Sequence, residues 1–273
     1  MNLTNAEIYL FYAAVLFYCI STVFYVLFFV AKNEKTLKAG YWTLLVAFVM
    51  HTAALAVRTM AAKRLPLTNQ YEFATSFTWG IALVTLVFKN KFKFKALGAV
   101  VCPILVILIG YAALQNKEIN ELMPALQSNW LSIHVGTAII SYGSFGVAFG
   151  VAFLYLIREH LKDKDFVEKH LPESEVLDLI GYRAIALGFI FLTLVMITGA
   201  IWAERAWGHY WSWDPKETWS LITWIIYAIY LHVRISRGWS GKKAAWFALI
   251  GFICVVFTYI GVNTLIPSLH SYA

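Results

Sequence analysis

The chain has 273 residues, of which 60% are hydrophobic and 14% are charged, and its mean hydropathy is +0.68. An ordinary water-soluble domain is excluded, because long uncharged apolar stretches of this kind match the thickness of a bilayer. The net charge of +7 is spread over several separate loops. It does not form the single basic patch that nucleic-acid binding requires.

Apolar stretches of about 17 to 25 residues, bounded by charged residues, predict about eight transmembrane helices. We expect the spans at residues 8–31, 40–60, 73–88, 96–114, 131–157, 181–203, 217–235 and 244–264. The fold class is therefore all-α, a polytopic integral membrane helical bundle. We treat residues 1–273 as a single membrane domain, with four N-terminal spans in 1–114 and a core in 131–273. The first span has no basic region before it, so we expect it to be retained and not removed as a signal peptide.

Lys and Arg indicate the orientation, because basic residues in short loops stay on the cytoplasmic side during insertion. The loops after the first, third, fifth and seventh spans are the richer set: Lys32, Lys35, Lys38, Lys89, Lys91, Lys93, Lys95, Arg158, Lys162, Lys164, Lys169, Arg234, Arg237, Lys242 and Lys243. The opposite loops hold only Lys63, Arg64, Lys117, Arg205 and Lys216. Both termini are therefore expected to be extracytoplasmic, with the basic loops beside anionic lipid.

The second span carries two polar residues. His51 falls near its middle, where an ionisable group is costly, so a functional role and a hydrogen bond to a neighbouring helix both stay open. Arg58 lies near the span end and is expected to extend its guanidinium to the surface. Residues 66–72 follow it and predict a capped turn that enters the third span, with a polar lid over a ligand as the alternative.

The fifth span and the segment after it contain a candidate histidine, a pair of glycines and a predicted surface helix. His134 lies at its outer start, and Gly146 and Gly150 form a small-residue pair that predicts close packing against another helix. Residues 159–178 predict a short surface helix broken at Pro172. We expect both histidines of this segment, His160 and His170, to be solvated.

Residues 207–224 contain Trp-Gly-His-Tyr-Trp-Ser-Trp-Asp-Pro-Lys-Glu-Thr-Trp, at the mouth of the seventh span. Asp214, Pro215 and Glu217 match a helix start with an N-cap, a proline at the first helical position and a capping box. We therefore interpret Asp214 and Glu217 mainly as capping residues and not as catalysts.

Aromatic residues crowd this loop and its two shoulders. Such residues also form belts at bilayer interfaces, but a belt spreads over many helices. The density here favours a flat aromatic shelf for a ligand, with Lys216 in reach of the ligand's acidic groups. The candidate binding residues are Trp202, Trp207, Tyr210, Trp211, Trp213, Asp214, Lys216, Trp219 and Trp224.

Histidines identify the expected ligand as haem. His134 and His270 fall on the same predicted side as the aromatic segment, and a haem iron accepts two axial imidazoles. His232 lies about 26 Å along the seventh span from Pro215, close to its cytoplasmic end. The cysteines Cys19, Cys102 and Cys254 are single and lie in apolar runs, which disfavours thiol redox chemistry.

These motifs resemble the CcsA-type (ResC-type) cytochrome c biogenesis proteins, the haem-handling subunit of the system II cytochrome c synthase. The resemblance covers nearly the whole chain. It is most specific in the tryptophan-rich motif of residues 202–224 (the family's WWD segment), in Trp-Leu-x-x-His-Val at 130–135, in Tyr-Leu-His-Val-Arg at 230–234 and in Leu-His-Ser-Tyr-Ala at 269–273.

The resemblance implies a path for haem b across the cytoplasmic (inner) membrane. His232 would bind iron at a site within the membrane, and His134 and His270 would bind it at an external site on the active, extracytoplasmic face. His51 is kept as a weak candidate ligand. The implied partners are a CcsB/ResB-type membrane subunit and an apocytochrome c with Cys-x-x-Cys-His, whose thiols add to the haem vinyl groups. The chain would then be a subunit of a cytochrome c haem lyase that acts by positioning haem, with no catalytic residue beyond the haem ligands.

Two alternatives remain. A CcmC-type protein would deliver haem to a chaperone, but it has fewer spans. A membrane cytochrome b would carry electrons to quinone, and it predicts pairs of histidines at matching depths inside the bilayer. His134 and His270 are instead predicted outside the bilayer, which favours cytochrome c assembly.

Overall fold

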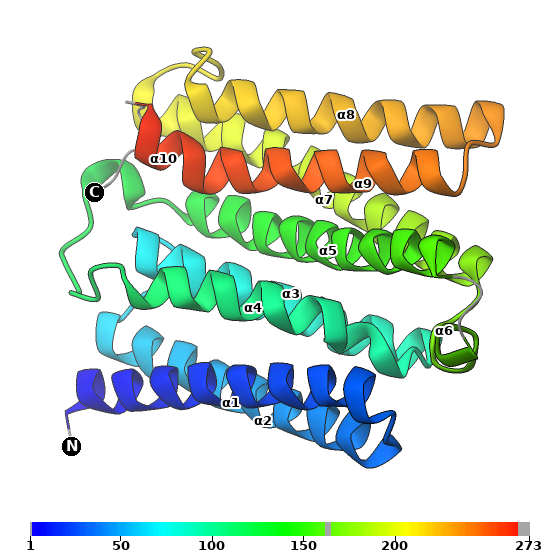
Figure 1. Ribbon diagram of the computed structural model, residues 1–273. Coiled ribbons are helices and arrows are strands. Elements are labelled where there is room, and N and C mark those ends of the chain that lie inside the picture. Colours follow the sequence, from blue (N-terminus) through cyan, green and yellow to red (C-terminus); the bar gives the residue numbers. More distant parts are fainter. Residues whose placement is uncertain (1, 162–164, 267–273) are drawn as a thin grey trace. The chain divides into compact units, whose positions relative to one another are not determined.

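The structure, a computed structural model, describes residues 2–161 and 165–266, and these residues form helices joined by short connections. The helices are α1 (Leu3–Ala31), α2 (Glu34–Ala62), α3 (Gln70–Phe92), α4 (Gly98–Ala113), α5 (Asn129–His160), α6 (Asp165–His170), α7 (Ser174–Trp207), α8 (Pro215–Arg237), α9 (Lys242–Val256) and α10 (Val262–Leu265) (Figure 1). Short 3-10 turns lie at Lys95–Leu97 and Pro124–Leu126, and a π-helical segment at Phe257–Gly261 joins α9 to α10. The all-α prediction is confirmed.

Each predicted span coincides with a helical segment of the structure. Among the described residues, seven helices are long and apolar enough to cross a membrane, counting α9 and its continuation to Leu265 as one. The remaining predicted span, 96–114, coincides with α4, whose 16 residues give a length of about 24 Å. This is shorter than the roughly 30 Å hydrocarbon core of a bilayer. The chain is therefore a multi-pass membrane protein, and the orientation of its termini stays a prediction.

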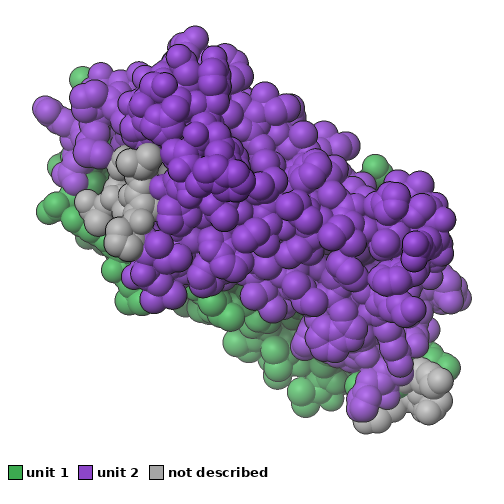
Figure 2. All heavy atoms as spheres, turned by 90° about the horizontal axis from the view of Figure 1, so that it is seen from above, with its two compact units in different colours: residues 1–119, 161–172 green, residues 120–160, 173–273 purple. Residues whose placement is uncertain are grey.

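Two compact units divide the chain (Figure 2). Unit 1 comprises residues 1–119 and 161–172, and so contains α1 to α4 and α6. Unit 2 comprises residues 120–160 and 173–273, and so contains α5 and α7 to α10. That residues 1–273 act as a single domain, with a core in 131–273, stays a prediction.

In unit 1, α1 and α2 pack along their lengths through a stripe of buried residues. On α1 the stripe recurs every three or four residues, as expected for one face of a helix: Glu7, Phe11, Ala14, Tyr18, Ser21, Tyr25 and Phe28. Two of its polar members bond to α2: Tyr18 Oη lies 3.1 Å from His51 Nδ1, and Ser21 Oγ donates to Gly40 O at 2.8 Å. Hydrogen bonds thus offset the cost of burying these groups.

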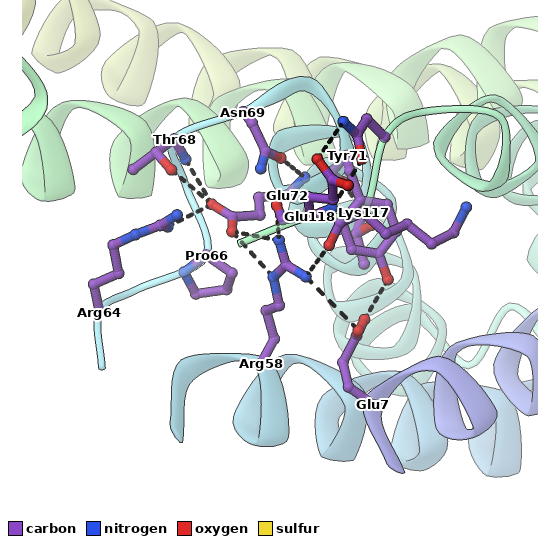
Figure 3. Close-up of polar contacts among 12 residues, drawn as sticks. Glu7, Arg58, Arg64, Pro66, Thr68, Asn69, Tyr71, Glu72, Lys117 and Glu118 are labelled. Carbon is purple, nitrogen blue, oxygen red and sulfur yellow. Dashed lines mark hydrogen bonds and ion pairs between the residues drawn. The ribbon is translucent and has the colours of Figure 1, made fainter. Parts of the chain in front are cut away.

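Arg58 is the centre of a buried ionic network, and the prediction that it reaches the surface is wrong. The residue is only 1% exposed. Its Nε and Nη2 donate to Glu72 Oε1 at 3.1 and 3.0 Å, and its Nη1 lies 3.8 Å from Glu7 Oε2 (Figure 3). The same guanidinium donates to the carbonyls of Lys117 and Glu118 at 2.6 and 3.1 Å. Arg58 therefore ties α1, α2 and α3 to the segment that follows α4.

Glu72 completes this network from the α3 side. Its Oε2 accepts Arg64 Nη1 at 2.7 Å and the backbone N–H and hydroxyl of Thr68 at 3.0 and 2.9 Å. Asn69 Oδ1 accepts Glu72 N at 2.8 Å and caps α3, so the predicted capped turn is confirmed. Tyr71 donates its hydroxyl to Glu7. The turn 66–72 is thus fixed by charges that balance within the protein.

The predicted surface helix is present as α6, and Pro172 lies between it and α7. Val167 and Leu171 are buried, which fixes this segment in unit 1. His160 is exposed, as expected. His170 is not solvated, because its ring packs edge-on against Phe28 at 5.2 Å and its Nδ1 lies 3.8 Å from Glu34 Oε1. The prediction for His170 is wrong because its neighbours come from distant parts of the chain.

In unit 2, α5 packs along α7 and α9, and α8 packs against α7 and α9. Gly143, Gly146 and Gly150 on α5 are buried, in agreement with the predicted close packing of this helix. The aromatic rings of Phe145 and Tyr227 stack at 3.8 Å between centroids with an interplanar angle of 5°. This stack joins α5 to α8 within unit 2.

Glu72→Gln tests the buried network. The substitution keeps the size of the side chain but leaves Arg58 and Arg64 without a full counter-charge, and breaking a buried pair costs about 3–5 kcal/mol. We expect the apparent unfolding midpoint in detergent to fall by about 10 °C. Glu121→Gln, at an exposed position, is the matched control and should leave the midpoint unchanged. Equal midpoints for the two variants would contradict the assigned role of the network.

Candidate functional site at the tryptophan-rich segment

The tryptophan-rich segment, residues 202–224, runs from the end of α7 through a loop at 208–214 into α8. Gly208 ends α7 with a φ of +81°, a left-handed conformation that favours glycine, and its N–H donates to Glu204 O at 2.8 Å. Asp214 begins α8 as its N-cap and forms the predicted capping box with Glu217. Local sequence thus fixes both ends of the loop.

Glu217 also holds the loop backbone. Its Oε2 accepts Ser212 N at 2.8 Å, Ser212 Oγ at 3.2 Å and Asp214 N at 3.1 Å. Between these two N–H groups, Trp213 has a φ of +61°, which is uncommon and unfavourable for a residue with a Cβ. The Trp213 side chain is 68% exposed. The carboxylate of Glu217 therefore stabilises a strained turn that directs an indole to the outside.

The aromatic rings of the segment differ in exposure, and two pairs of them are not coplanar. Tyr210 is 62% exposed, whereas Trp202 is 2% exposed. The rings of Trp202 and Trp207 meet at 63° and those of Trp211 and Trp213 at 89°. Within these two pairs neighbouring indoles pack edge to face, and the role of the segment as a shelf for a ligand stays a prediction.

The predicted binding residues on α8 have contacts within unit 2. Trp219 packs on Phe257, with ring centroids 4.3 Å apart. Trp224 donates its Nε1–H to Thr193 Oγ1 on α7 at 2.9 Å. Lys216 lies half-buried in the first turn of the helix. Trp224 thus helps to fix α8 against α7.

His134 lies where α5 meets α7. Its Nδ1 is 3.0 Å from the carbonyl oxygen of Val195, and its ring stacks on Trp202 with centroids 5.9 Å apart at an angle of 20°. A carbonyl only accepts hydrogen bonds, so Nδ1 must carry the proton. In that neutral tautomer Nε2 has the lone pair that ligates a metal.

The other candidate histidines lie elsewhere. His232 is exposed near the far end of α8, about 26 Å along the helix from Pro215. His51 is fully buried in unit 1 against Tyr18. His270 lies outside the described residues. The described part of the chain therefore brings His134 together with Trp202 and Trp207, and separates them from His232.

Two residues that sequence reasoning missed also contact the His134 ring. Val195 acts through its backbone carbonyl, which no sequence pattern reveals. Gly199 leaves the space that the imidazole occupies. No group of three or more His, Cys, Asp or Glu residues that could hold a metal ion occurs in residues 2–161 and 165–266.

Comparison with known families and proteins places the chain among cytochrome c assembly proteins. Residues 67–270 match the family described as Cytochrome C assembly protein. The cytochrome c biogenesis protein CcsA of Guillardia theta is 38% identical over 263 residues, which cover 88% of this chain and 87% of that protein. The CcsA protein of Trieres chinensis is 37% identical over 286 residues and covers 92% of each chain.

A solved structure described as Cytochrome c Heme Lyase CcmF has a similar fold. Its TM-score is 0.70 at 16% sequence identity, and the match covers 95% of this chain. The chain spans about half of that protein, since 47% of it is covered. At this level of identity the likeness extends to the fold alone.

Glu217→Ala tests the anchor of the loop. Loss of a capping interaction costs about 0.5–2 kcal/mol, so we expect amide hydrogen exchange in residues 208–214 to accelerate by roughly 2- to 30-fold. Exchange measured by mass spectrometry on detergent-purified protein provides the readout. Ser212→Ala removes one of the three donors and leaves both amides in place, so its effect should be much smaller. If the two variants exchange alike, Glu217 does not hold the turn.

Proposed function

Because this chain belongs to the CcsA-type cytochrome c biogenesis proteins, we propose that it carries haem b across the membrane and presents it for covalent attachment to apocytochrome c. The proposal places the attachment site at the tryptophan-rich segment. It includes a CcsB/ResB-type membrane subunit as partner. It also includes an apocytochrome c with a Cys-x-x-Cys-His motif as the acceptor of haem.

The geometry of His134 carries this proposal. The hydrogen bond from Nδ1 to the Val195 carbonyl selects the tautomer in which Nε2 is the ligating nitrogen. The stacking of the ring on the buried Trp202 limits its rotation. An axial ligand held in this way would bind haem iron without first having to be ordered. His270 is proposed as the second axial ligand of the external site.

The character of α8 supports a second, membrane-embedded haem site. Among the seven candidate spans, α8 is the least hydrophobic and also the least buried. An imidazole or another polar group facing lipid alone is unfavourable, so an exposed His232 on such a helix favours a covering ligand or partner. We propose that His232 binds haem within the membrane and that the partner subunit supplies the other ligand.

The chemistry that the chain would assist is thiol addition. Each cysteine S–H of the acceptor adds across a haem vinyl group, so a C–S bond forms and the proton ends on the neighbouring vinyl carbon without an external oxidant. Addition requires the sulfur to approach the vinyl carbon to about 3–3.5 Å. Tyr210 and Trp213 are exposed and lie where they could contact haem or acceptor. Lys216 and the other candidate residues would orient the haem, so the proposed role of the chain is positioning.

The proposed location is the cytoplasmic (inner) membrane, with the tryptophan-rich segment on the extracytoplasmic face. The basic residues of the loops after α1, α3, α5 and α8 support this orientation. Haem would then enter near His232 and leave near His134.

The test is the absorption spectrum of the protein purified together with its partner subunit. We expect His134→Ala and His270→Ala to lose the low-spin spectrum of the external haem and the formation of cytochrome c. Added imidazole should restore part of the spectrum, because it replaces the missing ligand. His232→Ala should lower the amount of haem that is bound at all.

His160→Ala is the matched control, since His160 is an exposed histidine at the C-terminal end of α5, outside both proposed sites. Its haem content and cytochrome c yield should equal those of the unsubstituted protein. Wild-type haem content in all three ligand variants, with no response to imidazole, would refute the assignment of the ligands.

A further inference from the structure

The imidazole of His134 lies against one face of α7, formed by residues 195, 199 and 202. These positions are four and three residues apart and so share a face of the helix. The carbonyl oxygen of Val195 accepts a hydrogen bond from Nδ1 of His134 at 3.0 Å, and the indole of Trp202 stacks on the imidazole ring. Gly199 lies between them in sequence and has no side chain. The ring therefore occupies the position where a side chain of residue 199 would lie.

The three atoms nearest to the space at Gly199 all belong to His134. A Cβ built on this glycine would lie 2.8 Å from His134 Cε1, 2.9 Å from Nδ1 and 3.7 Å from Nε2. Carbon atoms in favourable contact are about 3.5–4.0 Å apart. Since the backbone φ of Gly199 is that of an ordinary helix, the glycine is required by the ring and not by the conformation of α7.

The indole of Trp202, on which the His134 ring stacks, is itself fixed by contacts. Its indole Nε1–H donates to the carbonyl of Ala125 at 2.9 Å, and its ring meets Trp207 edge to face at 4.8 Å. A displaced imidazole would therefore meet a fixed indole. Movement of the ring away from α7 would also lengthen the hydrogen bond to Val195.

We propose that Gly199 is a positioning residue for His134. Because Gly199 has no side chain, the imidazole can approach the α7 backbone and bond to the Val195 carbonyl. This bond sets the tautomer, in which Nε2 is the ligating atom. This inference rests on the proposed function, because it assigns Gly199 a role through the proposed axial ligand. A methyl group at residue 199 would displace the imidazole ring of His134. The substitution itself replaces no residue of the aromatic segment.

The experiment compares Gly199→Ala with Gly181→Ala, a substitution on the same helix. At Gly181 an added Cβ would meet only Val151 Cγ1 at 3.9 Å, an ordinary contact. Disturbing the group that orients a metal ligand lowers affinity about 10- to 100-fold. We expect a loss of this size in haem affinity, with a shift from a low-spin to a high-spin spectrum that imidazole reverses, for Gly199→Ala only.

A double substitution separates positioning from folding. In unfolding scans of haem-free protein, Gly199→Ala should lower the midpoint in the native background but not in a His134→Ala background, where the ring is absent. An equal loss in both backgrounds would overturn the inference, because the added methyl group would then disturb helix packing in general.

The outcomes distinguish the inference from the function on which it rests. If His134→Ala loses the haem signal while Gly199→Ala matches Gly181→Ala, the inference fails and the proposed function stands. If His134→Ala keeps the wild-type spectrum, the proposed function itself fails. If both glycine variants lose the signal equally, the effect belongs to α7 as a whole and the role of Gly199 is refuted.

Discussion

The absence of water inside a bilayer is the constraint on which this structure depends, because each polar group placed there needs a partner from the protein. Many of the chain's polar side chains meet this requirement, in one of two ways. Threonine hydroxyls bond to the preceding turn of their own helix, as Thr75 and Thr85 do with the carbonyls of Tyr71 and Ile81. Larger groups bond between helices, as Arg58 does with Glu72. A buried polar residue therefore specifies which helices meet, and the apolar residues around it fill the remaining space.

The same requirement shapes the candidate site. The Nδ1 of His134 bonds to a carbonyl of the protein, which selects the tautomer and limits rotation of the ring. Glu217 uses its carboxylate for backbone N–H groups, and the strain of the turn at Trp213 is offset by those bonds. Each restraint lies within unit 2 and comes from α5, α7 or α8. A site built on three packed helices holds its side chains more firmly than a site on loops alone.

Features encoded over a few neighbouring residues were predictable from the sequence. The spans follow from apolar length, and the caps at Asn69 and Asp214 follow from local hydrogen-bonding rules. Contacts between distant residues were not predictable. Arg58 has the same sequence signature as a residue that reaches the surface, and only the meeting of α1, α2 and α3 shows its counter-charges. His170 was misjudged for the same reason. The tilt between indole rings depends on packing, so a list of tryptophans could not reveal that adjacent rings meet edge to face.

The π-helical segment at Phe257–Gly261 has a consequence for the last span. A π turn contains one residue more than an α turn, and each residue of an α-helix advances about 100° around the axis. The side chains from Val262 onward are therefore rotated by about that angle from where an unbroken α-helix would carry them. The register of α10 is thus offset from that of α9, and Trp219 packs on Phe257 at the first residue of the offset. Removing a single residue here would swing the entire downstream end of the span to a different side.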